Sequence, residues 1–93
     1  MRYRVRMDPR ALRDLAELPP VVRKRLAARI DTLADDPRPR SSIHLGGDLR
    51  GEFRLRIGDY RASYSISDRD QLVRVWAVGH RSRFYDEAGR RRR

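Results

Sequence analysis

The stretch from residue 51 to 64 constrains the fold of this chain more than any other. Two runs of alternating apolar and polar residues flank Gly58-Asp59, and Gly beside Asp is typical of a tight turn between antiparallel strands. With these two residues as the loop, Ile57 lies opposite Tyr60. The sequence therefore predicts a β-hairpin over residues 52–67, around which the rest of the chain is organised.

The predicted hairpin carries three arginines on one face. Because side chains alternate across a strand, Arg54, Arg56 and Arg61 share the face opposite to the apolar residues. Like charges directly opposed in a sheet are unfavourable, so converging guanidinium groups favour an anion between them. A solvated outer face in an arginine-rich protein is the alternative that this stretch alone leaves open.

The charge balance points to an anionic partner. The 93 residues include 23 Lys and Arg against 13 Asp and Glu, a net charge of +10. This excess favours nucleic acid, an acidic protein or anionic lipid as the partner. The chain has no cysteine, and its two histidines lack metal-ligand spacing, so we expect no cofactor and no metal. It also lacks a membrane-spanning apolar run and a signal-peptide core, and a cytoplasmic protein is expected.

The N-terminal part is typical of one strand followed by two helices. Residues 2–7 alternate basic with apolar side chains, as in a half-buried strand. Asp8-Pro9 then predicts a helix N-cap followed by proline at the first helical position. Pro19-Pro20 separates this helix from a second one, expected over residues 21–34. We expect the two helices to form a hairpin on one face of the sheet.

The remaining chain is expected to complete the sheet. Two prolines and clustered turn formers predict a loop over residues 35–48, with His44 as an ordinary surface residue. A final strand over residues 71–79 is apolar on both faces, as in a well-covered strand. Trp76 on this strand is interpreted as a core aromatic, with base stacking as the alternative.

Together these elements predict one small α+β domain of order β-α-α-β-β-β, with an antiparallel sheet of about four strands and the helical hairpin packed on one face. The domain is expected over residues 1–88. Four consecutive arginines end the chain, and residues 89–93 are predicted to be a disordered basic tail that adds attraction to a polyanion.

Basic and aromatic residues cluster directly after the last predicted strand. If that strand lies beside the hairpin, Arg81 and Tyr85 reach the arginine face. Guanidinium groups bind phosphate oxygens and stabilise the added charge of a phosphoryl transition state. RNA carries its own nucleophile in the 2′-hydroxyl, so cleavage requires positioning, charge stabilisation and proton transfer, without a metal. Whether His80 points into this site depends on the phase of the strand.

Three motifs give the chain a resemblance to a known family. The motifs are Leu45-Gly46-Gly47, then Phe53-Arg54-Leu55-Arg56-Ile57-Gly58-Asp59-Tyr60-Arg61 with Tyr64, and finally Val78-Gly79-His80-Arg81 with Tyr85. Their combination and order are similar to the RelE/ParE toxin superfamily, and within it to the RelE-type messenger-RNA interferases of toxin–antitoxin modules. The resemblance extends from Tyr3 to about Tyr85.

The resemblance implies a toxin that enters the ribosomal A site and cleaves the bound message as an endoribonuclease. The implied catalytic residues are Arg54, Arg56, Arg61, Arg81 and Tyr85, and His80 and Arg83 are expected to contact RNA. Lysines are common in the family at the positions of Arg54 and Arg56, and arginine keeps the charge but is a poorer proton donor or acceptor. Besides the ribosome and the message, the implied partner is a cognate antitoxin that is acidic where it touches the toxin.

Two other functions stay open at this level. The ParE branch of the same superfamily inhibits DNA gyrase by binding and cuts no RNA. A noncatalytic nucleic-acid-binding module would explain the charge and the arginine tail, but not the placement of Arg81 and Tyr85.

Overall fold

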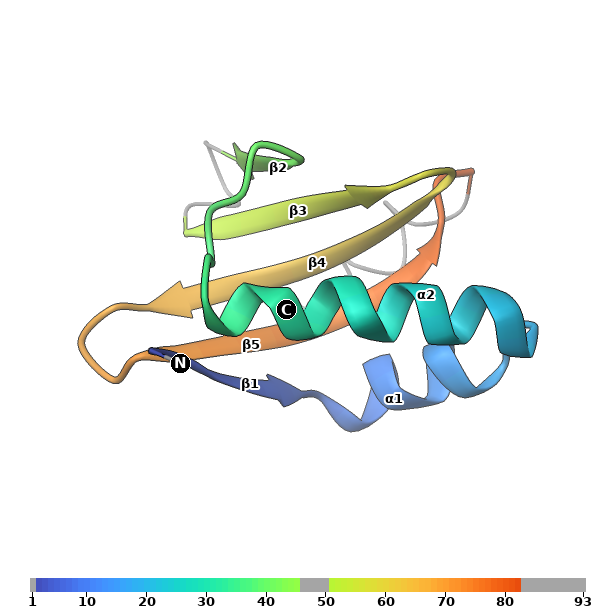
Figure 1. Ribbon diagram of the computed structural model, residues 1–93, viewed down its shortest axis with the longest axis horizontal. Helices are drawn as coiled ribbons and strands as arrows, with labels where there is room; N and C mark the ends of the chain where they lie inside the picture. The colour runs from blue at the N-terminus through green and yellow to red at the C-terminus, as the bar shows by residue number, and fades with distance from the viewer. Residues whose placement is uncertain (1, 46–50, 83–93) are drawn as a thin grey trace.

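The computed structural model describes residues 2–45 and 51–82 of the chain. Its elements are β1 (Arg4–Met7), α1 (Pro9–Ala16), α2 (Pro20–Asp31), the short 3-10 helix η1 (Thr32–Ala34), β2 (Ser42–Leu45), β3 (Glu52–Ile57), β4 (Tyr60–Ser67) and β5 (Leu72–His80). Figure 1 shows both helices on one side of a twisted sheet. The predicted α+β class and the helical hairpin on one face are confirmed.

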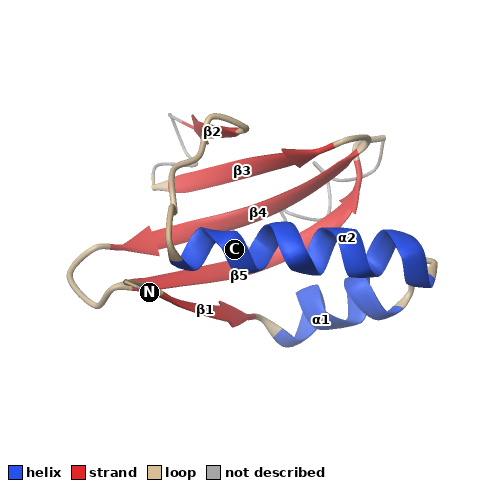
Figure 2. Ribbon diagram, viewed as in Figure 1, coloured by secondary structure: helices blue, strands red, loops and turns tan. Residues whose placement is uncertain are grey.

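The sheet has five strands in the order β1-β5-β4-β3-β2, with the strands drawn in red in Figure 2. An antiparallel sheet of about four strands was expected, and two features differ from it. Strand β2 adds to the edge beside β3, and β1 pairs with β5 in parallel. The parallel pairing places Val5 beside Val73 and Met7 beside Val75, so that the apolar side of β1 joins the core.

Strand β2 lies where a loop was predicted. Its four residues pair antiparallel with β3, with Ile43 opposite Arg54 and His44 opposite Phe53. The His44 ring stacks on the Phe53 ring with centroids 4.6 Å apart. A four-residue edge strand has too little local pattern to be recognised, because its hydrogen bonds come from the strand beside it. His44 is therefore a strand residue rather than a loop residue.

Helix α1 begins at the predicted residue, whereas α2 begins at Pro20, one residue before the predicted start, and ends at Asp31, where η1 replaces its predicted last turn. The Asp8 carboxylate caps α1 by accepting from the Arg10 backbone N–H at 2.9 Å, and Pro9 occupies the first turn. The helices bury Leu15, Leu26 and Ile30 against apolar residues of β3, β4 and β5. Among the described residues, the largest fully buried side chain is Tyr64 on β4, whose hydroxyl donates to the Pro37 carbonyl. In the described ranges, no helix is long and apolar enough to cross a membrane.

The hairpin has the predicted register, with Ile57 opposite Tyr60 and Arg56 opposite Arg61. Gly58 has φ 61°, which the tight turn requires and which glycine adopts without steric cost.

Strand β5 contains one more residue than the part of β4 that it faces. Ser63 pairs with Ala77, but Tyr64 pairs with Val75, so Trp76 is the extra residue of a β-bulge. Beyond a bulge the alternation of side chains between the two faces is reversed. Val73 and Val75 face the helices before the bulge, and Val78 joins the same core after it. The bulge thus decides which residues at the end of β5 face away from the helices.

The Asp8 cap generates the first prediction. The Arg10 side chain, which donates to the carboxylate at 3.0 Å, and the Arg10 backbone N–H lower the pKa of Asp8 from 3.8 to about 2. A depressed pKa stabilises the fold above the ordinary value, and that stability is lost as the pH falls through about 2. Asp8→Ala should lower the free energy of unfolding by about 1 kcal/mol near neutral pH. Asp8→Asn should keep most of the cap but lose this acid dependence. Urea unfolding at neutral and acidic pH measures the stability of each variant and its dependence on pH. Equal stability of Asp8→Ala and the wild type would contradict the capping role.

Candidate functional site

The sheet face turned away from the helices carries the candidate site, and we call it the open face. Pairing and alternation assign its residues: Arg4 and Arg6 on β1, Glu52, Arg54 and Arg56 on β3, Arg61, Ser63 and Ser65 on β4, and Arg74, Trp76, Ala77 and Gly79 on β5. The prediction that Arg54, Arg56 and Arg61 share one face agrees with this register. Their environments, however, are different.

Arg54 is buried and belongs to a polar cluster. Its side chain is 8% exposed, and its Nη2 lies 3.5 Å from Oε2 of Glu52, which is fully buried. The Ser63 hydroxyl donates to the same Glu52 oxygen. The positive charge of Arg54 is therefore balanced within the sheet, and the residue is less available to a phosphate than an exposed arginine.

Sequence reasoning missed Glu52. It left Glu52 out of the candidate site, although Glu52 precedes Arg54 by two residues and so lies on the same face of one strand. That spacing was a usable signal. The burial of Glu52 and Arg54 could not be predicted, because no local sequence pattern shows that these side chains are shielded from solvent.

Arg56 and Arg61 are directly opposed at the hairpin end of the open face. Arg56 is exposed, and Arg61 is half-buried. The Arg61 Nη1 donates to the backbone carbonyls of Gly58 and Tyr60 at 3.0 and 2.9 Å, which holds the guanidinium at the hairpin turn. Among the described residues, no carboxylate forms an ion pair with either arginine.

Arg81 joins this end of the sheet. Its backbone N–H donates to the Asp59 carbonyl at 2.9 Å, which extends the pairing of β5 one residue past the strand. Gly79 lies opposite Arg61, and the alternation after the bulge assigns Arg81 to the same side. Arg81 is exposed, and it too has no ion pair with a carboxylate in the part of the chain that the structure describes.

His80 lies on the other face. It pairs with Tyr60, and the two rings meet edge to face with centroids 5.4 Å apart. The Ser82 backbone N–H donates to Nδ1 of His80 at 3.2 Å, so the neutral ring carries its proton on Nε2. The sequence did not decide whether His80 points into the site. In the structure, the alternation along β5 directs His80 away from the arginines. The predicted roles of Tyr85 and Arg83, and the predicted tail at 89–93, lie outside the described residues.

The titratable groups with shifted pKa values mark structural contacts away from the hairpin end. The hydrogen bond from Arg38 lowers the pKa of Asp68, and the hydrogen bond to Asp68 raises the pKa of Tyr3. The bonds measure 2.9 Å from Arg38 and 2.7 Å from Tyr3. They tie the loop before β2 to the turn before β5. Perturbed pKa values also arise in structural ion-pair networks, and these groups belong to one.

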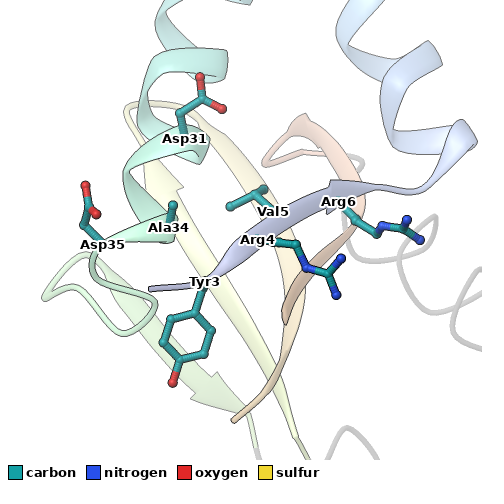
Figure 3. A pocket seen from close by; sticks show the side chains of 7 residues that line it. All are labelled: Tyr3, Arg4, Val5, Arg6, Asp31, Ala34 and Asp35. Carbon is teal, nitrogen blue, oxygen red and sulfur yellow. The ribbon is translucent and has the colours of Figure 1, made fainter. Parts of the chain in front are cut away.

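Besides the hairpin end, the described residues line a groove and a smaller hollow. A groove of about 650 Å³ follows the free edge of β1 and is lined by Tyr3, Arg4, Val5, Arg6, Asp31, Ala34 and Asp35. Figure 3 shows Arg4 and Arg6 directed away from Val5, as the alternation of β1 requires. A smaller hollow of about 190 Å³ lies between α2 and the hairpin turn. Within residues 2–45 and 51–82, no three His, Asp or Glu side chains gather as metal ligands.

The hairpin end can therefore bind an anion through several guanidinium groups at once. Arg56, Arg61 and Arg81 supply planar donor sets that match phosphate oxygens in pairs. Three adjacent positive charges without carboxylate partners also repel one another, and a bound phosphate relieves that repulsion.

The buried Glu52–Arg54 pair generates the second prediction. Glu52→Ala should lower the free energy of unfolding by about 3 kcal/mol, because it leaves a buried guanidinium without its carboxylate. Replacing both partners, as Glu52→Leu with Arg54→Met, should restore stability to near the wild-type value. Arg56→Ala, on the exposed part of the same strand, is the control and should change stability by about 0.5 kcal/mol or less. Urea unfolding compares the variants, and a Glu52→Ala effect no larger than that of Arg56→Ala would show that the pair has no structural role.

Comparisons with known proteins agree with this architecture. Residues 5–85 match the family model described as the ParE toxin of the type II toxin–antitoxin system parDE. A protein of Methanocaldococcus jannaschii named putative toxin RelE1 is 30% identical over 88 residues, which cover 91% of this chain and 97% of the relative.

Solved structures with the same fold include toxins in complex with their antitoxins. The archaeal RelE–RelB complex from Pyrococcus horikoshii matches with a TM-score of 0.77 and 31% identity, covering 89% of this chain and 99% of that one. The toxin–antitoxin complex RelBE2 from Mycobacterium tuberculosis matches with a TM-score of 0.72 and 36% identity, covering 87% and 100%. This chain belongs to the RelE/ParE superfamily and is a RelE-like toxin of a type II toxin–antitoxin system.

Proposed function

We propose that the chain is a ribosome-dependent endoribonuclease that cleaves messenger RNA in the ribosomal A site and so inhibits translation. The observation that carries the proposal is the meeting of Arg56, Arg61 and Arg81 at the hairpin end of the open face, without carboxylate partners among the described residues. RelE-named proteins are among the relatives and the structural matches, which adds support.

The proposed reaction is an internal transesterification of the message. The 2′-hydroxyl oxygen attacks the adjacent phosphorus, a new O–P bond forms, and the bond to the 5′-oxygen breaks. The 2′-hydroxyl loses its proton, and the leaving 5′-oxygen takes one up. The arginines hold the phosphate oxygens and stabilise the additional negative charge of the transition state.

The proton carriers are not the arginines. A guanidinium stays protonated at all ordinary pH values, so Arg56, Arg61 and Arg81 serve as electrostatic groups. Arg54 is paired with Glu52, and its part in the site is to fix the strand that carries Arg56. The family resemblance assigns Tyr85 to stacking on or activating the nucleotide that is cut, and we propose this role for it here.

We also propose an antitoxin partner whose acidic segment covers the basic open face. The matched solved structures include complexes of RelE with RelB, and a chain of net charge +10 suits an acidic segment that folds on binding.

Inhibition of DNA gyrase is the alternative, favoured by one observation: the matching family model describes the ParE toxin. The two functions differ in their first effect on the cell. The nuclease stops protein synthesis, whereas the gyrase inhibitor allows translation while DNA damage accumulates. A noncatalytic nucleic-acid-binding module would produce neither cleavage nor DNA damage.

The third prediction concerns the arginines. Arg61→Ala and Arg81→Ala should each reduce message cleavage by about 100-fold, because each removes a donor to the transition-state charge. Growth inhibition on expression without antitoxin should be relieved in parallel. Arg13→Ala removes the same charge from the exposed surface of α1, on the other side of the sheet, and is the control. Full toxicity of both site variants, with folded protein shown by circular dichroism, would rule out this site.

The fourth prediction concerns the ribosome. Purified protein should cut a message on translating ribosomes far faster than the same RNA free in solution, because the A site holds the RNA in the reactive geometry that this small domain does not impose alone. Mapping of 5′ ends before and after addition of the protein measures both rates. Equally fast cutting of free RNA would contradict ribosome dependence.

A further inference from the structure

Trp76 is the only tryptophan of the chain, and it is not part of the core. The sequence alone favours a core position, with base stacking as the alternative, and the bulge is the reason why Trp76 lies outside the core. As the extra residue of β5, Trp76 lies on the open face, half-buried, with its Nε1 donating to the Ser65 hydroxyl at 3.1 Å. The hydrogen bond holds the indole against the sheet in one orientation.

Arg74 covers the indole from the same strand. Its guanidinium carbon lies 4.6 Å from the centroid of the Trp76 ring, a cation–π contact. Arg74 is exposed, and Arg6 lies beside it across the β1–β5 pairing. Arg4 follows on the same side of β1, and Figure 3 shows Arg4 and Arg6 projecting together from that strand.

This region has the charge and the rings that a single-stranded nucleic acid recognises. Among the described residues, Arg4, Arg6 and Arg74 form no ion pair with a carboxylate. Bases stack on aromatic rings and on guanidinium planes, and the phosphates are attracted by the surrounding charge. An acidic peptide would use the three arginines but would have no need of the indole.

We infer that the surface of Trp76, Arg74, Arg6 and Arg4 binds the single-stranded RNA that leads to the hairpin end of the open face, with a base stacked on the Trp76–Arg74 pair. We call this surface the tryptophan platform. Ser65, which holds the indole, is four residues from Arg61 along β4, a separation of about 13 Å. The inference rests on the proposed function because it takes the bound RNA to be the message.

Binding can be tested without ribosomes. A fluorescein-labelled oligouridine, short and single-stranded, is titrated with the full-length protein, and fluorescence anisotropy gives the dissociation constant. Trp76→Leu should weaken binding by about tenfold, because it removes the stacking surface. Trp76→Phe keeps an aromatic face and should bind within about threefold of the wild type.

The charge is tested separately at an exposed residue. Arg74→Ala should weaken binding and reduce the slope of log affinity against log salt by about 1. Arg13→Ala, with the same change of net charge on α1, should leave the affinity close to that of the wild type. Since Trp76 is the sole tryptophan, its own fluorescence in the wild type should also change on addition of oligouridine. Oligoglutamate of the same charge should change it much less, because it has no base to stack.

Several results would overturn the inference: Trp76→Leu and Arg74→Ala binding like the wild type, Arg13→Ala losing as much as Arg74→Ala, or oligoglutamate changing the tryptophan fluorescence while oligouridine does not. Cleavage of translated message by the wild type is measured in parallel. If the wild type cleaves the message but the variants of the tryptophan platform bind oligouridine normally, the proposed function is supported and the platform is contradicted. If binding depends on the platform but no cleavage occurs, the platform is supported and the proposed function is contradicted.

Discussion

The pairing of β5 with β4, and the one-residue bulge within it, is the constraint on which the candidate site depends. Before Trp76, strand β5 turns Val73 and Val75 toward the helices; after it, Val78 faces them. An unbroken alternation would have turned His80, not Arg81, toward Arg61. The bulge thus turns apolar side chains toward the core at both ends of a nine-residue strand. It also sets which basic residue joins Arg56 and Arg61 at the hairpin end.

The arginines of the open face are of two kinds because their surroundings differ. Arg54 is desolvated, and Glu52 balances its charge, since a lone buried guanidinium would cost several kcal/mol. Arg56 and Arg81 remain in solvent, where positive charge costs little and stays available to a ligand. The two kinds have different roles. The buried Glu52–Arg54 pair fixes strand β3, and the exposed Arg56 and Arg81 carry the positive charge that an anion can reach.

Much of the fold was predictable from local chemistry. Asp8-Pro9 and Pro19-Pro20 marked the helix boundaries, and Gly58-Asp59 set the hairpin register, since caps, prolines and tight turns act over a few residues. The edge strand at Ser42–Leu45 and the parallel pairing of β1 were not predicted. Both depend on backbone partners supplied by distant segments, and neither leaves a pattern in four residues.

The sequence by itself determined that Arg54, Arg56 and Arg61 lie on one face of the hairpin, because the turn fixes the register of its two strands and side chains alternate along each of them. It also determined the excess of positive charge that any partner must match. Only the tertiary structure decided that Arg54 is paired with Glu52, that His80 turns away, and that Trp76 lies outside the core. The physical reason is that burial and strand phase depend on the strands paired across the sheet, as Ser63 opposite Arg54 and the bulge of β5 show, and the local sequence pattern does not fix that pairing.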